Sequence, residues 1–167
     1  MKLLLEALIK FACGVVLVGA MLFLPAGTLG FSAGWLLMGL LFIPMFLAGI
    51  VMFAKAPALL KKRLDAKEKQ RTQKGVLGFS GLMFIAGFVV AGLDHRFGWS
   101  NVPTWVVITA SVLFLAAYAL YAEVMRENAW LSRTVHVQEG QQVVSSGLYG
   151  VVRHPMYTAT VFLFLSI

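Results

Sequence analysis

The residues best suited to chemistry stand close together near the end of the chain, in the stretch GLYGVVRHPMYTATVFLFLSI. Arg153 and His154 come directly before Pro155, and proline is favoured in the first turn of a helix because its φ is already helical. Pro155 also steers His154 away from α geometry. The first-turn N–H groups and the positive end of the helix dipole then point the same way as the two basic side chains. The pattern predicts an anion site at the start of a helix.

Two tyrosines, Tyr149 and Tyr157, flank these bases. Their rings could supply faces for a flat or cationic ligand, since an aromatic ring attracts a cation by about 0.5 to 2 kcal/mol. A ligand with a carboxylate, an aromatic base and a sulfonium would suit the whole set. Arginine and tyrosine at a membrane interface also serve as plain anchors. The residues alone leave both interpretations open.

The rest of the chain has the composition of a membrane protein. Of its 167 residues, 60% are hydrophobic and 13% are charged, about half the charge of an ordinary soluble domain. Four apolar stretches reach membrane-spanning length, and they are expected to be helical because a lone strand would leave backbone groups unpaired in hydrocarbon. They run from about Leu8 to Leu24, Trp35 to Ala54, Val76 to Leu93 and Trp105 to Val124.

These stretches predict an all-α, polytopic helical membrane protein with one membrane domain over residues 1–167. Residues 1–124 form its four-helix front half. Residues 125–167 hold a cytoplasmic connection and the Arg-His-Pro motif, which enters a fifth helix.

The positions of lysine and arginine predict the orientation. Thirteen of the fourteen fall at the front of the chain, in the 55–74 connection or in residues 125–153, and only Arg96 falls on the other side. The positive-inside bias then places the N-terminus and the motif in the cytoplasm, at the inner (plasma) membrane if the protein is bacterial. The 55–74 connection is also expected to form an amphipathic helix on the lipid headgroups. It has no interleaved aromatics, so membrane lipids rather than nucleic acid are the expected partners.

Few polar residues outside the motif are candidates for a site. Glu123, near the cytoplasmic end of the fourth span, is costly to place in lipid, so we expect it to face the bundle, pair with Arg126 and reach the pocket. Asp94 and His95 are interpreted as a solvated loop, and His136 as a structural residue of the connection. There is no Ser-His-Asp pattern, Cys-His pair or metal-spaced His cluster, so neither a metal nor a catalytic nucleophile is predicted.

GLYGVVRHPMYTA resembles the signature of the isoprenylcysteine carboxyl methyltransferase and phospholipid methyltransferase superfamily. There a Gly-x-Tyr turn leads through an Arg-His-Pro-x-Tyr element into a helix, and the resemblance covers residues 127–159. It implies an integral membrane enzyme that uses S-adenosylmethionine to methylate a lipophilic acceptor, such as a prenylcysteine-type carboxylate or a phospholipid amine. The cofactor-binding residues that it implies are Tyr149, Arg153, His154, Pro155 and Tyr157.

The chain departs from that pattern in three places. Leu148 stands where proline is frequent, and Ala159 stands where glycine is frequent. The twelve residues from Met156 to Ile167 give about 18 Å of helix, against a hydrocarbon core of about 30 Å. The family continues through further helix to an acidic pair and a basic tail. We therefore expect a fifth helix that is cut short, in a fragment or in a protein whose partner supplies the remainder.

Two alternatives remain. The membrane sterol reductases share a related signature and use NADPH, but there an asparagine typically precedes the tyrosine, where this chain has Met156. That difference favours methyl transfer. The second alternative is an inactive or truncated membrane scaffold protein.

Overall fold

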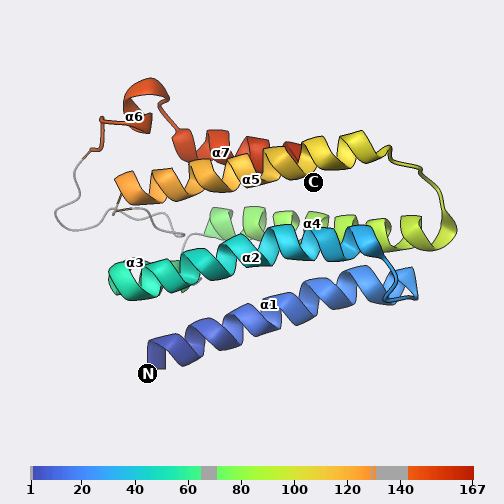
Figure 1. Ribbon diagram of the computed structural model, residues 1–167. Helices are drawn as coiled ribbons and strands as arrows, with labels where there is room; N and C mark the ends of the chain where they lie inside the picture. Colours follow the sequence, from blue (N-terminus) through green and yellow to red (C-terminus); the bar gives the residue numbers. More distant parts are fainter. Residues whose placement is uncertain (1, 65–70, 129, 131–142) are drawn as a thin grey trace. The chain divides into compact units, whose positions relative to one another are not determined.

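The computed structural model describes residues 2–64, 71–128, 130 and 143–167, and every regular element in them is a helix. Figure 1 shows the helices in chain order. They are α1 (Lys2–Ala26), α2 (Ser32–Lys55), α3 (Pro57–Leu64), α4 (Arg71–Phe97), α5 (Thr104–Glu127), α6 (Leu148–Val151) and α7 (Pro155–Leu165).

Four of these helices are long and apolar enough to cross a membrane: α1, α2, α5 and the part of α4 from Leu77 to Phe97. The prediction of an all-helical protein with four membrane-spanning helices is confirmed to that extent. A fifth helix does begin at Pro155, but it has only 11 residues. Its passage through the membrane, and the cytoplasmic side of the N-terminus, stay predictions.

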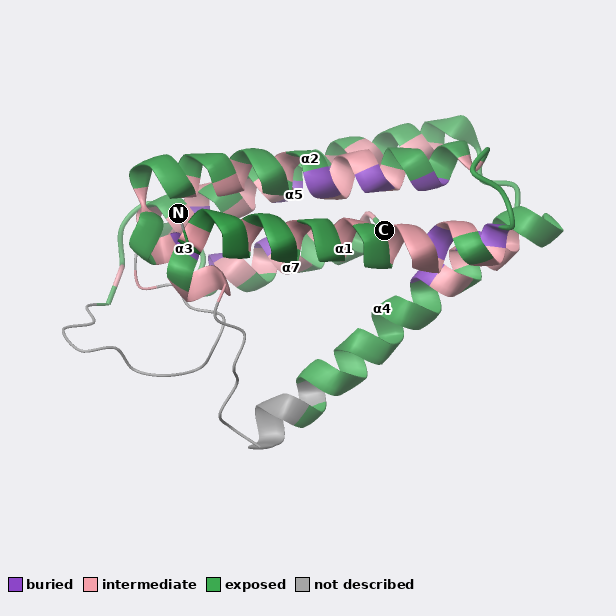
Figure 2. Ribbon diagram, turned by 90° about the horizontal axis from the view of Figure 1, so that it is seen from below, coloured by how far each residue is buried: buried purple, intermediate pink, exposed green. Residues whose placement is uncertain are grey.

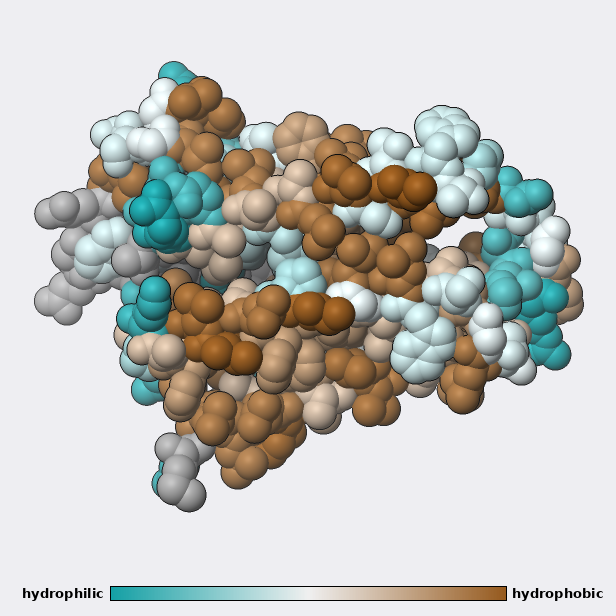
Figure 3. Space-filling model, in the orientation of Figure 1, coloured by the Kyte–Doolittle hydropathy of each residue, from teal (hydrophilic) through white to brown (hydrophobic). Residues whose placement is uncertain are grey.

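The helices carry apolar side chains around most of their circumference. Val16, Leu24 and Phe79 are 71%, 76% and 72% exposed, and Figure 3 shows apolar surface over the middle of the helices with polar residues gathered toward their ends. A helix that is apolar on all sides suits a lipid surrounding, because its backbone hydrogen bonds are satisfied internally. The outward apolar surface therefore agrees with an integral membrane protein.

The chain divides into two compact units, Met1–Asn101 and Val102–Ile167. In the first unit α1 packs against both α2 and α4, and the buried core consists of Leu22, Met38, Phe42 and Phe88. Gly92 of α4 lies so close to α1 that a β-carbon on it would overlap the carbonyl oxygen of Leu22. Figure 2 shows that the earlier part of α4 is exposed, and residues 77–87 are exposed throughout.

The last residue of the short helix α3 is hydrogen-bonded to a side chain of α1. Lys10 of α1 donates hydrogen bonds from Nζ to the carbonyl oxygen of Leu64 at 2.8 Å and to Oε1 of Glu6 at 2.6 Å. A cation at the last carbonyls of a helix also complements its dipole. Of the 55–74 connection, the structure shows a helix over residues 57–64, with Leu60 buried and Lys61 exposed, while residues 65–70 lie outside the described residues. Its placement on the lipid headgroups stays a prediction.

At the other end of the same unit, the turn between α1 and α2 lies beside the end of α4. The turn uses Gly27 at φ 69°, and Trp35 donates from Nε1 to the carbonyl of Leu29 at 2.8 Å. The ring of His95 stacks on that of Phe31, with centroids 4.3 Å apart. The interpretation of Asp94 and His95 as a loop was wrong, because both lie in the last turn of α4, where the helical pattern runs on to Phe97.

In the second unit α7 packs along α5, and the short helix α6 connects to the start of α7. The buried side chains of α5 are Phe114, Ala117 and Val124. Those of α7 are Pro155 and Ala159, one turn apart. The other residues of α7 are partly or fully exposed.

Candidate functional site

A hollow of about 420 Å³ opens on the exposed side of the start of α7. Its lining residues are Val152, Arg153, His154, Tyr157, Thr158, Val161 and Phe162. Three of the five predicted site residues, Arg153, His154 and Tyr157, are brought together in it. Among the residues that the structure describes, the basic groups that line the hollow are Arg153 and His154, and the remaining wall is mostly apolar.

The backbone before Pro155 explains how the two basic residues reach the surface. Val152 ends α6 in an extended conformation (φ −130°, ψ 129°), and His154 follows at φ −133°, ψ 66°, outside the α region. Pro155 then occupies the first turn of α7, as predicted from its fixed φ. Arg153 and His154 thus form a non-helical step between two helices, and both side chains are exposed.

The first turn of α7 contributes fewer donors to the hollow than the sequence predicts. The carbonyl of His154 accepts the N–H of Tyr157 at 3.0 Å and that of Thr158 at 3.2 Å. Pro155 has no N–H at all. The predicted anion site would therefore depend mainly on the Arg153 and His154 side chains. The ring centroids of His154 and Tyr157 lie 5.4 Å apart.

The other two predicted site residues lie beneath this surface or to one side of it. Pro155 is fully buried. Tyr149 is half-buried in α6, and its hydroxyl accepts a hydrogen bond from Nδ2 of Asn128 at 2.8 Å. Neither is among the residues that line the hollow. Their direct contact with a cofactor stays a prediction, and the contacts seen here are with the protein itself.

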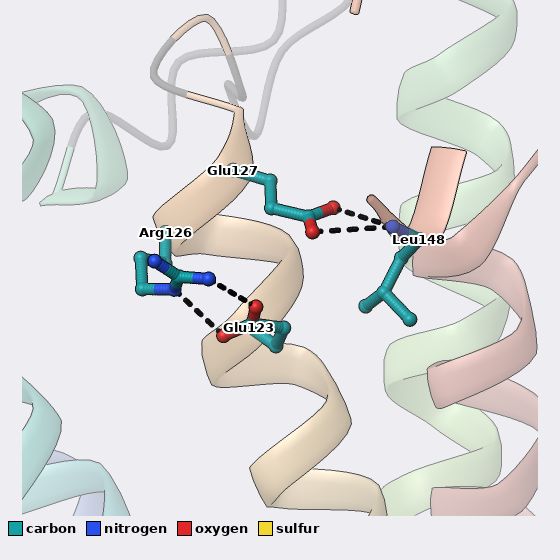
Figure 4. A network of polar contacts seen from close by, with 4 residues as sticks. All are labelled: Glu123, Arg126, Glu127 and Leu148. Carbon is teal, nitrogen blue, oxygen red and sulfur yellow. Dashed lines mark hydrogen bonds and ion pairs between the residues drawn. The ribbon is translucent and has the colours of Figure 1, made fainter. Parts of the chain in front are cut away.

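Glu123 forms the predicted pair with Arg126, as Figure 4 shows. The guanidinium donates from Nε to Oε2 at 2.8 Å and from Nη2 to Oε1 at 2.5 Å. The i, i+3 spacing on α5 is what allows this contact. Glu123 is not among the lining residues of the hollow, so its role in the pocket stays a prediction.

The next carboxylate, Glu127, was not identified from the sequence. Both of its oxygens accept the backbone N–H of Leu148, at 3.1 and 2.9 Å (Figure 4). The position of Glu127 in the last turn of α5 does indicate such a contact. A carboxylate there faces the negative end of the helix dipole, so it needs a hydrogen-bond donor from another part of the chain. Which donor satisfies it cannot be derived from that signal.

His136 lies outside the described residues. In the parts of the chain that the structure describes, no group of three or more His, Cys, Asp or Glu side chains is arranged to hold a metal ion.

The chain was compared with protein-family models, with curated proteins and with solved structures, and none of them matches it. The resemblance to the methyltransferase superfamily therefore rests on the motif residues themselves, and three of these line one surface hollow.

Proposed function

We propose that this protein is an integral membrane methyltransferase that transfers a methyl group from S-adenosylmethionine to a lipophilic acceptor. The observation that carries the proposal is the hollow at the start of α7, where Arg153, His154 and Tyr157 of the motif meet an apolar wall. Its volume of about 420 Å³ falls in the range of small-molecule sites, roughly 300–1,000 Å³.

The lining residues fit much of this cofactor. The guanidinium of Arg153 and the imidazole of His154 can each donate a hydrogen bond to a carboxylate, and the ring of Tyr157 suits an adenine face or a sulfonium. The amino group of the methionine part would need an acidic or carbonyl partner, and the lining residues in the described part of the chain include no acid. Tyr149 of α6 and Pro155 of α7 stay candidate contacts of the cofactor, and Glu123 of α5 stays a candidate polar residue of the pocket.

The reaction asks little covalent chemistry of the protein. A sulfonium methyl is already a strong electrophile, so the bound cofactor supplies the reactive group. The residues of the hollow need only hold an acceptor in line with it and exclude water. Val161 and Phe162 extend the hollow along α7 and give an apolar surface for such an acceptor. A prenylcysteine-type carboxylate and a phospholipid amine both have the amphipathic character that this surface would accept.

The proposal is tested by calorimetric titration of the detergent-purified protein with S-adenosylmethionine and, separately, with NADPH. Arg153→Ala and His154→Ala should each weaken S-adenosylmethionine binding by about 1.5 to 3 kcal/mol, because each removes a hydrogen bond to a charged group. Arg96→Ala is the matched control, since Arg96 also lies beside an aromatic ring, that of Phe97, at 5.7 Å but in the other unit.

The titration also separates the alternatives. A phosphate would suit Arg153 as a carboxylate does, so tighter binding of NADPH would favour a reductase related to the sterol reductases. Binding of neither ligand would favour a membrane scaffold and would leave the motif as an interfacial anchor. Equal affinity in the wild type and in Arg153→Ala and His154→Ala would contradict the site assignment.

A further inference from the structure

Two consecutive residues at the end of α5 bind two consecutive residues at the start of α6. The carboxylate of Glu127 accepts the N–H of Leu148, and Nδ2 of Asn128 donates to the hydroxyl of Tyr149 at 2.8 Å. In each pair the partners are 21 residues apart. Oδ1 of Asn128 also accepts the N–H of Trp130 at 3.0 Å, so both ends of its amide are engaged and its orientation is fixed.

The turn into α6 is shaped around the Glu127 carboxylate. Gly147 has φ 56° and ψ −129°, a conformation that residues with a β-carbon rarely adopt. A β-carbon on Gly147 would overlap the carboxylate of Glu127. The backbone conformation therefore favours glycine here, and a β-carbon would in addition displace the carboxylate from its place beside the Leu148 N–H.

These contacts bear on the hollow through the chain that follows. Residues 148–151 form α6, Val152 is extended, and Arg153 and His154 come next before Pro155 is buried in the second unit, where α7 packs along α5. The step that carries the two bases thus lies between two attachments to α5, one through Glu127 and Asn128 and one through the packing of α7. Loosening the first would free one end of the step.

We propose that Glu127, supported by Asn128, is a positioning residue that fixes the placement of Arg153 and His154. Its effect on a ligand rests on the function proposed above, whereas its effect on the two bases does not. Glu127 acts through the Leu148 N–H and is not among the residues that line the hollow.

The first test uses the NMR signal of the His154 ring to follow its placement. The chain has three histidines, so ring-labelled histidine gives few NMR signals, and His154→Gln identifies the signal of His154. Glu127→Ala should shift or broaden that signal and speed the hydrogen exchange of the Leu148 amide at least tenfold. Glu127→Gln should change both little, because its amide oxygen still accepts a hydrogen bond. His95, in the other unit, is an internal control whose signal should stay in place.

The second test measures the affinity for S-adenosylmethionine. Glu127→Ala, and Glu127→Asp with its shorter side chain, should weaken S-adenosylmethionine binding at least tenfold, and Glu127→Gln less than threefold. Glu6→Gln, in an exposed i, i+4 pair with Lys10, is the control carboxylate. A His154 signal that is the same in Glu127→Ala and in the wild type overturns the proposal, and so does equal loss in the Gln and Ala variants. A wild type that binds no S-adenosylmethionine, yet shows the expected His154 shift, overturns the methyltransferase function and supports the positioning role.

Discussion

Gly92 of α4 and Leu22 of α1 meet backbone to backbone. A β-carbon on Gly92 would overlap the Leu22 carbonyl oxygen, and it would also stand 3.1 Å from the β-carbon of Pro25. Small residues at such crossings let membrane helices approach closely. Close van der Waals packing matters in lipid because the hydrophobic effect does not drive helices together there. Leu22 itself is fully buried at this crossing.

Gly92→Ala should therefore destabilise the first unit by about 1 to 3 kcal/mol, because the added methyl forces the two helices apart. Gly87→Ala is the matched control on the same helix, since nothing lies within 4 Å of the β-carbon that it adds. Denaturation in detergent micelles, followed by circular dichroism, measures the difference. Equal stability of the two variants would contradict the close crossing.

Gly147→Ala should disrupt the turn into α6, because alanine is strained at φ 56° and its methyl meets the Glu127 carboxylate. In a Glu127→Ala background the collision is gone and only the backbone strain remains, so the added cost of Gly147→Ala should fall. A double-mutant cycle on unfolding free energy should give a coupling of about 0.5 to 3 kcal/mol. Additive effects would mean that the two residues do not meet.

Ala159→Leu should weaken the packing of α7 along α5 by about 1 to 3 kcal/mol, because Ala159 is 1% exposed and a larger side chain cannot be fitted there. Val161→Leu enlarges the same helix on a side that is 55% exposed and should cost much less. Thermal unfolding of both variants in the same detergent makes the comparison. A larger loss in Val161→Leu would show that α7 packs by its other side.

Tyr157→Phe should keep most of the affinity for a cationic or flat ligand, because it keeps the ring, while Tyr157→Ala should lose about 0.5 to 2 kcal/mol. Tyr157 is 69% exposed, so either change should leave stability nearly unaltered. Titration with S-adenosylmethionine reads both variants. If Tyr157→Phe and Tyr157→Ala lose the same affinity, the hydroxyl rather than the ring is the binding group.

The predicted orientation can be checked with single cysteines. After Cys13→Ala, a cysteine in place of Ser100 should react with an impermeant thiol reagent from outside the cell. A cysteine in place of Ser145 should react only after the membrane is opened. Both positions are exposed in the structure. The reverse pattern would invert the positive-inside assignment.

Local rules were enough to predict several features of this fold. Proline at the first position of a helix marked the start of α7, apolar length marked the four long helices, and the i, i+3 spacing gave the Glu123–Arg126 pair. Each depends on neighbours within one or two turns.

The remaining contacts depend on pairs that are distant in sequence. Apolar periodicity does not say which helices pair, so the crossing at Gly92 and the packing of α7 along α5 were not predicted. The hydrogen bond between Glu127 and the N–H of Leu148 joins residues that are 21 apart in the sequence. It depends on the turn before α6, in which Gly147 has a positive φ. The hydrogen bond between Asn128 and the hydroxyl of Tyr149 was not predicted either, and the assignment of Tyr149 to ligand binding stays a prediction.

If α3 lies on the lipid headgroups as predicted, the hydrogen bond from Lys10 to the end of α3 also sets how deep α1 lies in the bilayer. Lys10 is eight residues beyond the start of α1, which is about 12 Å along the helix axis. Wherever the basic side of α3 meets the headgroups, the first two turns of α1, with Lys2 and Glu6, must extend past that level. Only about 25 Å of α1, from Lys10 to Ala26, is then left to cross the hydrocarbon. This is shorter than an average core of about 30 Å, so the first unit should favour a thin membrane or thin the bilayer around it.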